Sequence, residues 1–211
     1  KLSNDCACFD ISLGCSGYVY ALSVVKSFME SNSLEKGVLI TSDPYSKIID
    51  SNDRNTSLLF GDASSATLIS SNPVFEIMKF TFGTSGKDHT SLINNNGSLF
   101  MNGRSIFNFV AKKVPIDIKH LLRINDIEKD QIDKFIFHQG SKYIIDTIVK
   151  RLNLNHKKVP FSISSYGNTV SSSIPIILEE FLSSSKLNLI LLSGFGVGLS
   201  WSSVILKKIN K

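Results

Sequence analysis

The stretch that decides the fold is CFDISLGCSG, residues 8–17, where an apolar segment leads into a turn around a cysteine. Residues 8–13 have the composition of a buried strand, and apolar residues at helical spacing follow the turn. Cys15 would therefore lie at a helix N-terminus, where unpaired backbone N–H groups and the helix dipole favour a negative charge. We expect this position to lower the pKa of the thiol into a range of roughly 3.5–7.5.

Cys15 has two interpretations on this pattern alone. It can be a nucleophile, because Gly14 and Gly17 let the chain turn sharply and let a substrate approach the sulfur. It can also be an ordinary cysteine of the hydrophobic core, since free cysteine is among the most buried residue types. The rest of the sequence favours the nucleophile.

The composition indicates a globular protein and argues against several other classes. The chain of 211 residues is 42% hydrophobic and 19% charged, and no apolar run reaches the roughly 18 residues of a membrane helix. The net charge of +5 reflects a general richness in lysine, without the basic and aromatic stripe that would suggest nucleic acid. Three cysteines and four scattered histidines give no disulfide framework and no metal-ligand spacing. We therefore expect no metal, no membrane or nucleic-acid partner, and a reducing, cytoplasmic setting.

Strands and helices alternate along the chain. The apolar patterns predict helices from the Cys15 turn to about residue 31 and at 104–122, 144–152 and 174–182, and strands at 8–13, 37–42, 63–70, 135–137, 159–163, 187–193 and 199–206. We expect the strands at 37–42 and 63–70 to be fully buried. Pro115 should stop or kink the helix that contains it.

This alternation predicts an α/β protein with a largely parallel sheet that ends in an antiparallel pair. Ligands in such folds bind beyond the carboxyl ends of strands. Cys15, His138, Asn168 and the glycine-rich turn at 194–198 all fall at or just past such ends. The position of these residues indicates a site, although a lone histidine at a strand end can be structural and Asn168 can be a simple turn residue.

Five ordered motifs extend from the nucleophile segment to the end of the chain. They are residues 9–17, then 53–56 with 59–63, then His138-Gln139, then 167–169 with 173–175, and finally 194–198 with Trp201. In this order and at these intervals the sequence resembles β-ketoacyl-acyl carrier protein synthase III, a condensing enzyme of the thiolase superfamily.

The resemblance implies a thiolase-like fold in which mixed sheets and helices are layered as αβαβα, with the first half incomplete in this chain. Residues 1–72 would be the remainder of the N-terminal half, which carries the nucleophile, and residues 73–211 the C-terminal half. Because the chain starts at Lys1, just upstream of the nucleophile segment, we expect it to be a fragment of a longer protein.

The same resemblance implies a decarboxylating condensation in fatty acid biosynthesis. Cys15 would accept the acyl group of an acyl-CoA, with the backbone N–H groups of Cys15 and Val197 forming the oxyanion hole. A malonyl group on acyl carrier protein would then lose carbon dioxide, and His138 with Asn168 would stabilise the resulting enolate. The implied partners are acyl-CoA, acyl carrier protein and a second copy of the chain, with no further cofactor.

The resemblance also assigns the binding of the CoA thioester. Arg54 would contact the nucleotide end of CoA, and a set of apolar or small residues would line the pantetheine tunnel and acyl pocket: Leu59, Phe60, Met101, Gly103 and Phe195. Ordinary core packing is the alternative interpretation of the apolar members.

Three places depart from the family pattern. Gly140-Ser141 replaces the usual alanine and asparagine, Tyr143 stands where an arginine for carrier docking is expected, and Val197 replaces a common glycine. A backbone N–H donor tolerates valine at that position if φ is negative. The first two departures leave room for an acyltransferase of the same fold that passes the acyl group to an alcohol or amine in secondary-metabolite or surface-sugar biosynthesis. A further alternative is an inactive truncated or partner subunit that keeps the motifs of the fold without a complete active site.

Overall fold

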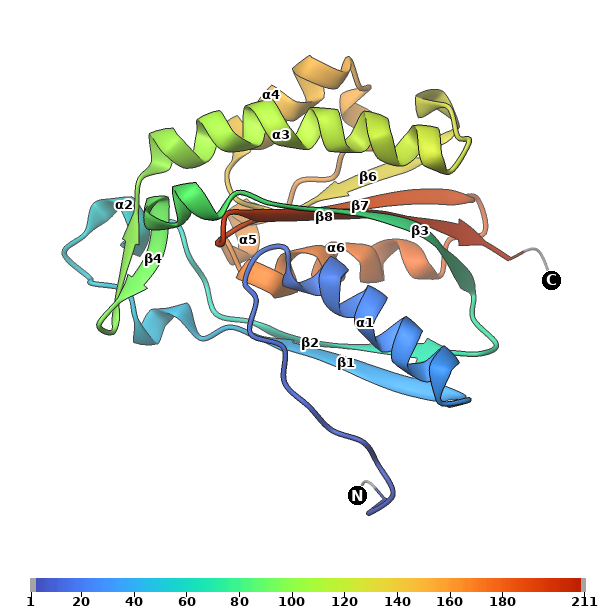
Figure 1. The fold of residues 1–211 in the computed structure, drawn as a ribbon. Helices are drawn as coiled ribbons and strands as arrows, with labels where there is room; N and C mark the ends of the chain where they lie inside the picture. The colour runs from blue at the N-terminus through green and yellow to red at the C-terminus, as the bar shows by residue number, and fades with distance from the viewer. Residues whose placement is uncertain (1–2, 210–211) are drawn as a thin grey trace.

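The structure, a computed structural model, describes residues 3–209 and arranges them in layers of sheet and helix (Figure 1). The outermost layer is a two-stranded antiparallel sheet of β1 (Lys36–Ser42) and β2 (Ser64–Ser70). Helices α1 (Gly17–Ser31) and α6 (Ser173–Leu182) lie between this sheet and a second, larger one. The result is an α/β fold with mixed sheets, as predicted.

The second sheet has four strands in the order β3-β8-β7-β6. Its members are β3 (Phe75–Thr84), β8 (Ser200–Lys208), β7 (Leu189–Gly196) and β6 (Lys134–Phe137). Helices α3 (Gly103–Ile124) and α4 (Lys142–Leu152) cover its far face (Figure 1). A hairpin of β4 (Leu92–Asn95) and β5 (Ser98–Met101) leads into α3.

Short helical segments complete the chain. They are η1 (Tyr45–Lys47), α2 (Arg54–Ser57), η2 (Gly86–Ser91), η3 (Lys129–Gln131), η4 (His156–Lys158), α5 (Ile163–Tyr166) and η5 (Val170–Ser172). Within residues 3–209, none of the helices has both the length and the apolar character that crossing a membrane requires.

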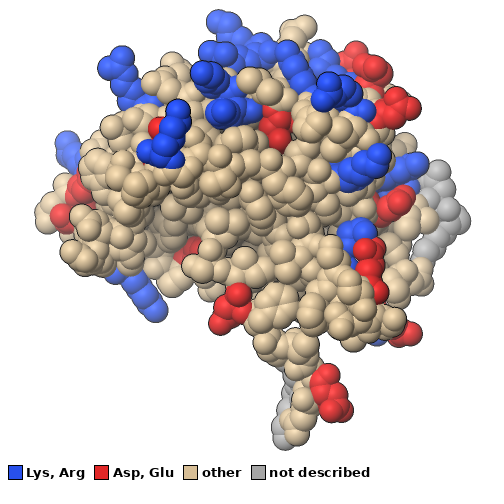
Figure 2. All heavy atoms as spheres, in the orientation of Figure 1, with Lys and Arg blue, Asp and Glu red and all other residues tan. Residues whose placement is uncertain are grey.

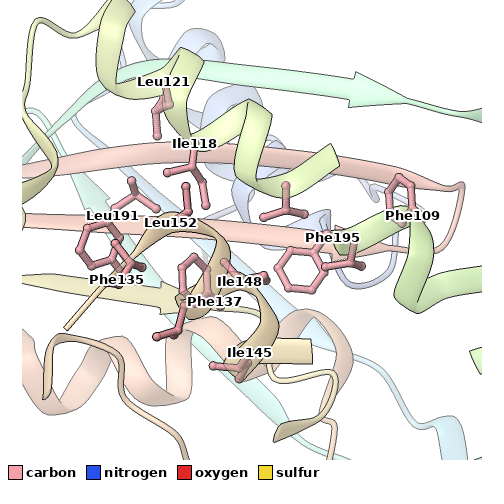
Figure 3. Close-up of a cluster of buried hydrophobic side chains, with 14 of the residues drawn as sticks. Phe109, Ile118, Leu121, Phe135, Phe137, Ile145, Ile148, Leu152, Leu191 and Phe195 are labelled. Carbon is pink, nitrogen blue, oxygen red and sulfur yellow. The ribbon is translucent and has the colours of Figure 1, made fainter. Parts of the chain in front are cut away.

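The larger sheet is buried on both faces because successive side chains of a strand point to opposite sides. Phe135 and Phe137 of β6 enter the cluster beneath α3 and α4, whereas Ile136 between them enters the cluster around α1 and α6. The first cluster is drawn in Figure 3, where aromatic rings from β6 and β7 interleave with aliphatic side chains from both covering helices. This double burial fixes where each strand ends, and therefore where the site lies.

Several predictions about the sheets are wrong. The larger sheet is mainly antiparallel, since β6 and β7 form its parallel pair while β3 and β7 both run antiparallel to β8. Strands β1 and β2 are not fully buried: one face of each is open, and Val38, Ile40 and Leu68 are exposed. Within residues 3–209 nothing covers that face, so alternation replaces the continuous burial expected of a parallel strand.

Two predicted strands do not form. Residues 8–13 follow an extended path on which the ring of Phe9 lies 5.5 Å from that of Phe28 in α1, and within residues 3–209 no strand pairs with them (Figure 1). Residues 159–163 make no ladder either, because Pro160 has no backbone N–H to donate and α5 begins at Ile163. In both cases an apolar composition was present but the backbone partners were not.

Helix α3 continues through Pro115 to Ile124, so Pro115 does not stop the helix. The proline removes one backbone hydrogen bond from the helix. However, Pro115 itself is buried, and the neighbouring Val114 and Ile118 are fully buried in the cluster of Figure 3. Tertiary packing on both sides of the proline therefore holds the helix together across the missing bond.

A buried carboxyl group ties α3 to the sheet. Thr81 Oγ1 and Ser203 Oγ donate hydrogen bonds to Asp117 Oδ2 over 2.9 and 2.7 Å, and Ser203 Oγ also lies 2.8 Å from Ser193 Oγ. Burial raises the pKa of Asp117, while the two hydroxyl donors act in the opposite direction.

We predict that Asp117→Ala lowers the free energy of unfolding by about 1–3 kcal/mol, because it leaves the hydroxyls of Thr81 and Ser203 buried without their acceptor. Asp117→Asn should cost less, since an amide oxygen still accepts from both. Urea unfolding measures the effect, with the exposed Ile116→Ala on the same helix as the control. Equal midpoints for Asp117→Ala and the control would contradict the prediction.

Candidate active site

Cys15 lies in a tight turn that leads into α1. Gly17 N donates to Gly14 O over 2.6 Å, and Ser16 Oγ lies 2.7 Å from Ser200 Oγ at the start of β8. The cysteine is only 3% exposed, as the core interpretation requires, yet it lines a pocket, as the nucleophile interpretation requires. The turn therefore presents a buried sulfur to an internal space.

The end of β7 approaches this turn through glycine. A Cβ atom on Gly196 would lie 2.6 Å from Cys15 Cβ and 2.8 Å from Cys15 Sγ, and one on Gly194 would lie 2.8 Å from Cys15 O. Real Cβ atoms do not come so close, so only glycine lets the strand pass against the cysteine. The contact brings the backbone N–H of Val197 toward Sγ.

The pKa of the Cys15 thiol is raised to about 12, which corrects the lowered value expected from its helix position. Removal from water is the largest cause, and the nearby carboxyl of Asp43 adds to it. Backbone N–H groups of Val197 and of Cys15 itself act against the rise by donating toward the sulfur. Burial outweighs the helix N-terminus, so the resting group is a thiol with two backbone donors beside it.

His138 follows β6 and is held from both sides. Its backbone N donates to Ser193 O over 2.9 Å, its ring meets that of Phe195 edge-on at 5.6 Å, and Nδ1 lies 2.8 Å from Ser173 Oγ. Burial lowers the pKa of His138 to about 3, with the carbonyl of Val170 acting against the shift. The imidazole is therefore neutral at pH 7.

The hydroxyl of Ser173 sets the tautomer of that imidazole. Ser173 Oγ lies within hydrogen-bond distance of both His138 Nδ1 and Val170 O, at 2.8 and 2.9 Å. When the hydroxyl donates to Nδ1, the ring proton is on Nε2, and when it donates to Val170 O, the ring proton is on Nδ1.

Val170 has a positive φ of 53°, an unusual conformation for a β-branched residue that costs of order 1–3 kcal/mol.

Asn168 is fixed by both its backbone and its side chain. Its backbone N donates to Leu59 O over 2.8 Å, its carbonyl accepts from Gly61 N over 3.0 Å, and its Oδ1 accepts from Val170 N over 3.0 Å. With the oxygen engaged, Nδ2 remains as a donor on a residue that lines the pocket.

One pocket of about 210 Å³ joins these residues. Cys15, His138 and Asn168 line it, and so do all five residues assigned to the tunnel: Leu59, Phe60, Met101, Gly103 and Phe195. The other lining residues are Leu92, Ile106, Phe107, Val110, Gly140, Ser141, Tyr143, Ile144 and Gly196. Ile106, Phe107 and Val110 all belong to α3, so one face of that helix forms a wall of the pocket.

Arg54 is not among the residues that line the pocket. It is exposed at the start of α2, where the side chain of Asp53 caps the helix by accepting from Asn55 N over 3.0 Å. Val197 directs its backbone N–H, not its side chain, toward the sulfur of Cys15. The φ of Val197 is not positive, so valine fits this turn. Within residues 3–209 no group of three or more His, Cys, Asp or Glu residues is placed to hold a metal ion.

Comparison with known proteins gives consistent matches along the chain. The family model for 3-oxoacyl-[acyl-carrier-protein (ACP)] synthase III matches residues 9–86, and the model for its C-terminal part matches residues 122–208. The β-ketoacyl-[acyl-carrier-protein] synthase III of Streptococcus agalactiae serotype III (strain NEM316) is 36% identical over 217 residues, covering 94% of this chain and 67% of the relative. The protein of the same name from Porphyra umbilicalis is 33% identical over 220 residues, covering 94% of this chain and 68% of that relative.

Solved structures give the same result. A crystal structure of 3-oxoacyl-(acyl-carrier protein) synthase from Burkholderia xenovorans LB400 matches with a TM-score of 0.89 and 34% identity, over 98% of this chain and 66% of that one. The crystal structure of the 3-oxoacyl-[acyl-carrier-protein] synthase III of Aquifex aeolicus VF5 matches with a TM-score of 0.88 and 32% identity, over 94% of this chain and 66% of that one. The chain thus spans about two thirds of the length of its relatives. These matches favour the synthase III interpretation over the acyltransferase and inactive-subunit interpretations.

The pKa of Cys15 predicts a specific pH dependence of its alkylation. In a Cys6→Ser, Cys8→Ser background, iodoacetamide should label Cys15 slowly at pH 7, and the rate should rise about tenfold per pH unit toward pH 12, because only the thiolate reacts. Mass spectrometry of timed samples gives the rate. A plateau below pH 8 would instead support the lowered pKa expected from the helix dipole.

The glycine contact at the nucleophile predicts a second effect. Gly196→Ala should lower the free energy of unfolding by about 1–3 kcal/mol, because the added methyl group overlaps Cys15. Gly86→Ala is the control, since a Cβ there meets nothing within 4 Å. If the two variants unfold at the same urea concentration, the close approach of β7 to the cysteine is wrong.

Proposed function

Because the chain belongs to the 3-oxoacyl-[acyl-carrier-protein] synthase III family, we propose that it catalyses the decarboxylating condensation of an acyl-CoA primer with malonyl-acyl carrier protein in fatty acid biosynthesis. One observation supports this most directly. Cys15, His138 and Asn168, from three distant parts of the sequence, share a single apolar pocket of about 210 Å³. A nucleophile and two neutral donors are the groups that this reaction needs.

In the first half of the proposed reaction, Cys15 attacks the thioester carbonyl of the primer. The Sγ–carbon bond forms, the carbon–sulfur bond to CoA breaks, and the thiol proton goes to the departing CoA sulfur. The carbonyl oxygen becomes negative in the intermediate, and the backbone N–H groups of Cys15 and Val197 stabilise it. Since both donors already point toward the sulfur, little reorganisation is required.

In the second half, a malonyl thioester enters and loses its carboxylate as carbon dioxide. His138 Nε2–H and Asn168 Nδ2–H stabilise the enolate oxygen, and the enolate carbon attacks the acyl group on Cys15. The Cys15 sulfur leaves and regains a proton. This role requires the tautomer in which Ser173 donates to His138 Nδ1, so we assign Ser173 as a positioning residue.

The rim of the pocket supports a pantetheine arm as the route of entry. Phe107 of α3 and the exposed Tyr143 of α4 stack at 4.8 Å beside it. Figure 2 shows lysine and arginine side chains gathered on the side of the molecule that carries α3 and α4, where Lys112, Lys150 and Arg151 are exposed. That face suits an acidic carrier protein, with Tyr143 in place of the usual arginine. Arg54 is the proposed contact for the nucleotide end of CoA.

We extend the proposal to a homodimer in the cytoplasm. Exposed apolar side chains on residues 8–13 and β1, among them Phe9, Val38 and Ile40, suit coverage by further protein. Cys6 and Cys8 are free and exposed, which suits a reducing compartment.

The proposed function predicts covalent loading of Cys15. Incubation with acetyl-, butyryl- or hexanoyl-CoA should add the acyl mass to the intact protein, and Cys15→Ala should abolish the addition. Cys8→Ser should load normally and serves as the control.

Release of labelled carbon dioxide from malonyl-acyl carrier protein should fall about 100- to 1,000-fold in Asn168→Ala and in His138→Ala, because each removes one donor to the enolate. Absence of loading by every acyl-CoA would refute the proposal.

A further inference from the structure

Asp43 directly follows β1 and contacts the segment that leads into α6. Its Oδ2 atom accepts hydrogen bonds from Ser171 N over 3.1 Å and from the Ser171 hydroxyl. Thr41, two residues earlier, makes a second contact with the same segment, since its Oγ1 atom lies 2.7 Å from Ser172 Oγ. Ser171 and Ser172 are both buried. The end of β1 therefore holds two consecutive residues of η5 through buried polar contacts.

The segment that Asp43 holds contains an unusual backbone conformation. Val170, directly before Ser171, is fully buried and has a φ of 53°. Such a conformation persists only where the surrounding contacts over-determine it. The two hydrogen bonds from Ser171 to Asp43 are contacts of this kind, because they fix the residue that follows Val170.

The turn at Val170 is connected to both proposed donors to the enolate. Val170 N donates to Asn168 Oδ1 over 3.0 Å and so orients the side-chain amide. Val170 O lies 2.9 Å from Ser173 Oγ, which in turn lies 2.8 Å from His138 Nδ1. A shift of Val170 would therefore displace the contacts of Asn168 and of His138 together. Misplacement of a catalytic group by about 1 Å can cost about 100-fold in rate.

Asp43 also acts on the nucleophile through its charge. Its carboxyl adds to the larger effect of burial in raising the pKa of Cys15. His138 is neutral above pH about 3, and burial raises the pKa of Tyr45, so neither places a charge beside the thiol at pH 7–9. A negative charge here disfavours the thiolate, so acylation does not explain an aspartate at this position. The contacts with Ser171 give Asp43 a role in the other half of the reaction.

Resting on the function proposed above, we propose that Asp43 is a positioning residue for the decarboxylation half of the reaction. It holds the turn at Val170, and through this turn it directs the amide of Asn168 and the imidazole of His138 to one enolate oxygen. The hydrogen bonds of the carboxylate carry this role, and its charge does not. Asp43 itself is not among the residues that line the pocket.

The test separates the hydrogen bonds of Asp43 from its charge. Asp43→Asn keeps an oxygen that can accept from Ser171 but removes the charge, whereas Asp43→Ala removes both. With an acetyl, butyryl or hexanoyl group preloaded on Cys15, the release of labelled carbon dioxide from malonyl-acyl carrier protein is measured. We expect the rate to fall about 10- to 100-fold in Asp43→Ala and about threefold at most in Asp43→Asn.

Alkylation of Cys15 in the Cys6→Ser, Cys8→Ser background gives a second readout. Both Asp43 variants should react with iodoacetamide about two- to fivefold faster at pH 9, because loss of the negative charge makes the thiolate easier to form. A merely structural role would not shift this pH profile in Asp43→Asn.

Asp133→Asn is the matched control. Asp133 Oδ2 also accepts two hydrogen bonds, from Asn188 N and Leu189 N over 2.7 and 3.0 Å. These contacts lie where β6 and β7 begin, whereas the site lies where these strands end. The control should change neither the release of carbon dioxide nor the alkylation profile.

The outcomes distinguish the role of Asp43 from the proposed function. Unchanged release of carbon dioxide in Asp43→Ala would overturn the role and leave the condensing function standing. An equal fall in Asp43→Asn would also overturn it, since the charge would then carry the effect. If the unaltered protein neither loads an acyl group nor releases carbon dioxide, both proposals fail.

Ser171→Ala keeps the test decisive if Asp43→Ala does not fold. It removes one of the two donors to Asp43 and leaves the charge in place. The release of carbon dioxide should slow about three- to tenfold while the alkylation profile of Cys15 stays the same. An unchanged rate of release in Ser171→Ala would overturn the role of Asp43.

Discussion

The site depends on the close contact between the end of β7 and the turn that leads into α1. Strand β7 contributes only glycines to this contact, Gly194 and Gly196. Any Cβ on Gly196 would enter the space of Cys15 Sγ, and any on Gly194 would enter the backbone of Cys15 and Ser16. The same strand accepts the backbone N–H of His138 at its residue Ser193. A single steric constraint therefore positions Cys15, the backbone N–H groups beside its sulfur and the neighbouring His138 together.

The electrostatic character of the site follows from that close packing. Burial raises the pKa of Cys15 to about 12 and lowers that of His138 to about 3, so both groups are neutral at every pH between these values. The donors are backbone N–H groups, an amide and a neutral imidazole, none of which carries a charge of its own. In apolar surroundings such donors stabilise a new negative charge more strongly than they would in water. The site is thus suited to reactions in which the charge arises on the substrate.

The local motifs of the sequence picked out residues that share one pocket, whereas its strand patterns misplaced parts of the sheets. Cys15, His138 and Asn168 follow from motifs, because each depends on a local turn whose residues are adjacent in the chain. Strand pairing depends on partners that are distant in the chain, and within residues 3–209 neither residues 8–13 nor residues 159–163 form a ladder, although both have strand-like composition. The continuity of α3 through Pro115 is decided by tertiary burial, which no local rule includes.

The departure at Val197 shows why a motif is better judged in three dimensions. The proposed oxyanion donor is a backbone N–H, so the identity of the side chain matters only through the volume it occupies and the φ it allows. Val197 Cγ1 fills the position that a Cβ on Gly14 would need, and the Tyr45 hydroxyl borders the same position. Gly14, Tyr45 and Val197 therefore form one packing unit drawn from three distant segments. A substitution at any of them therefore changes the packing beside Cys15 before it changes the backbone donors.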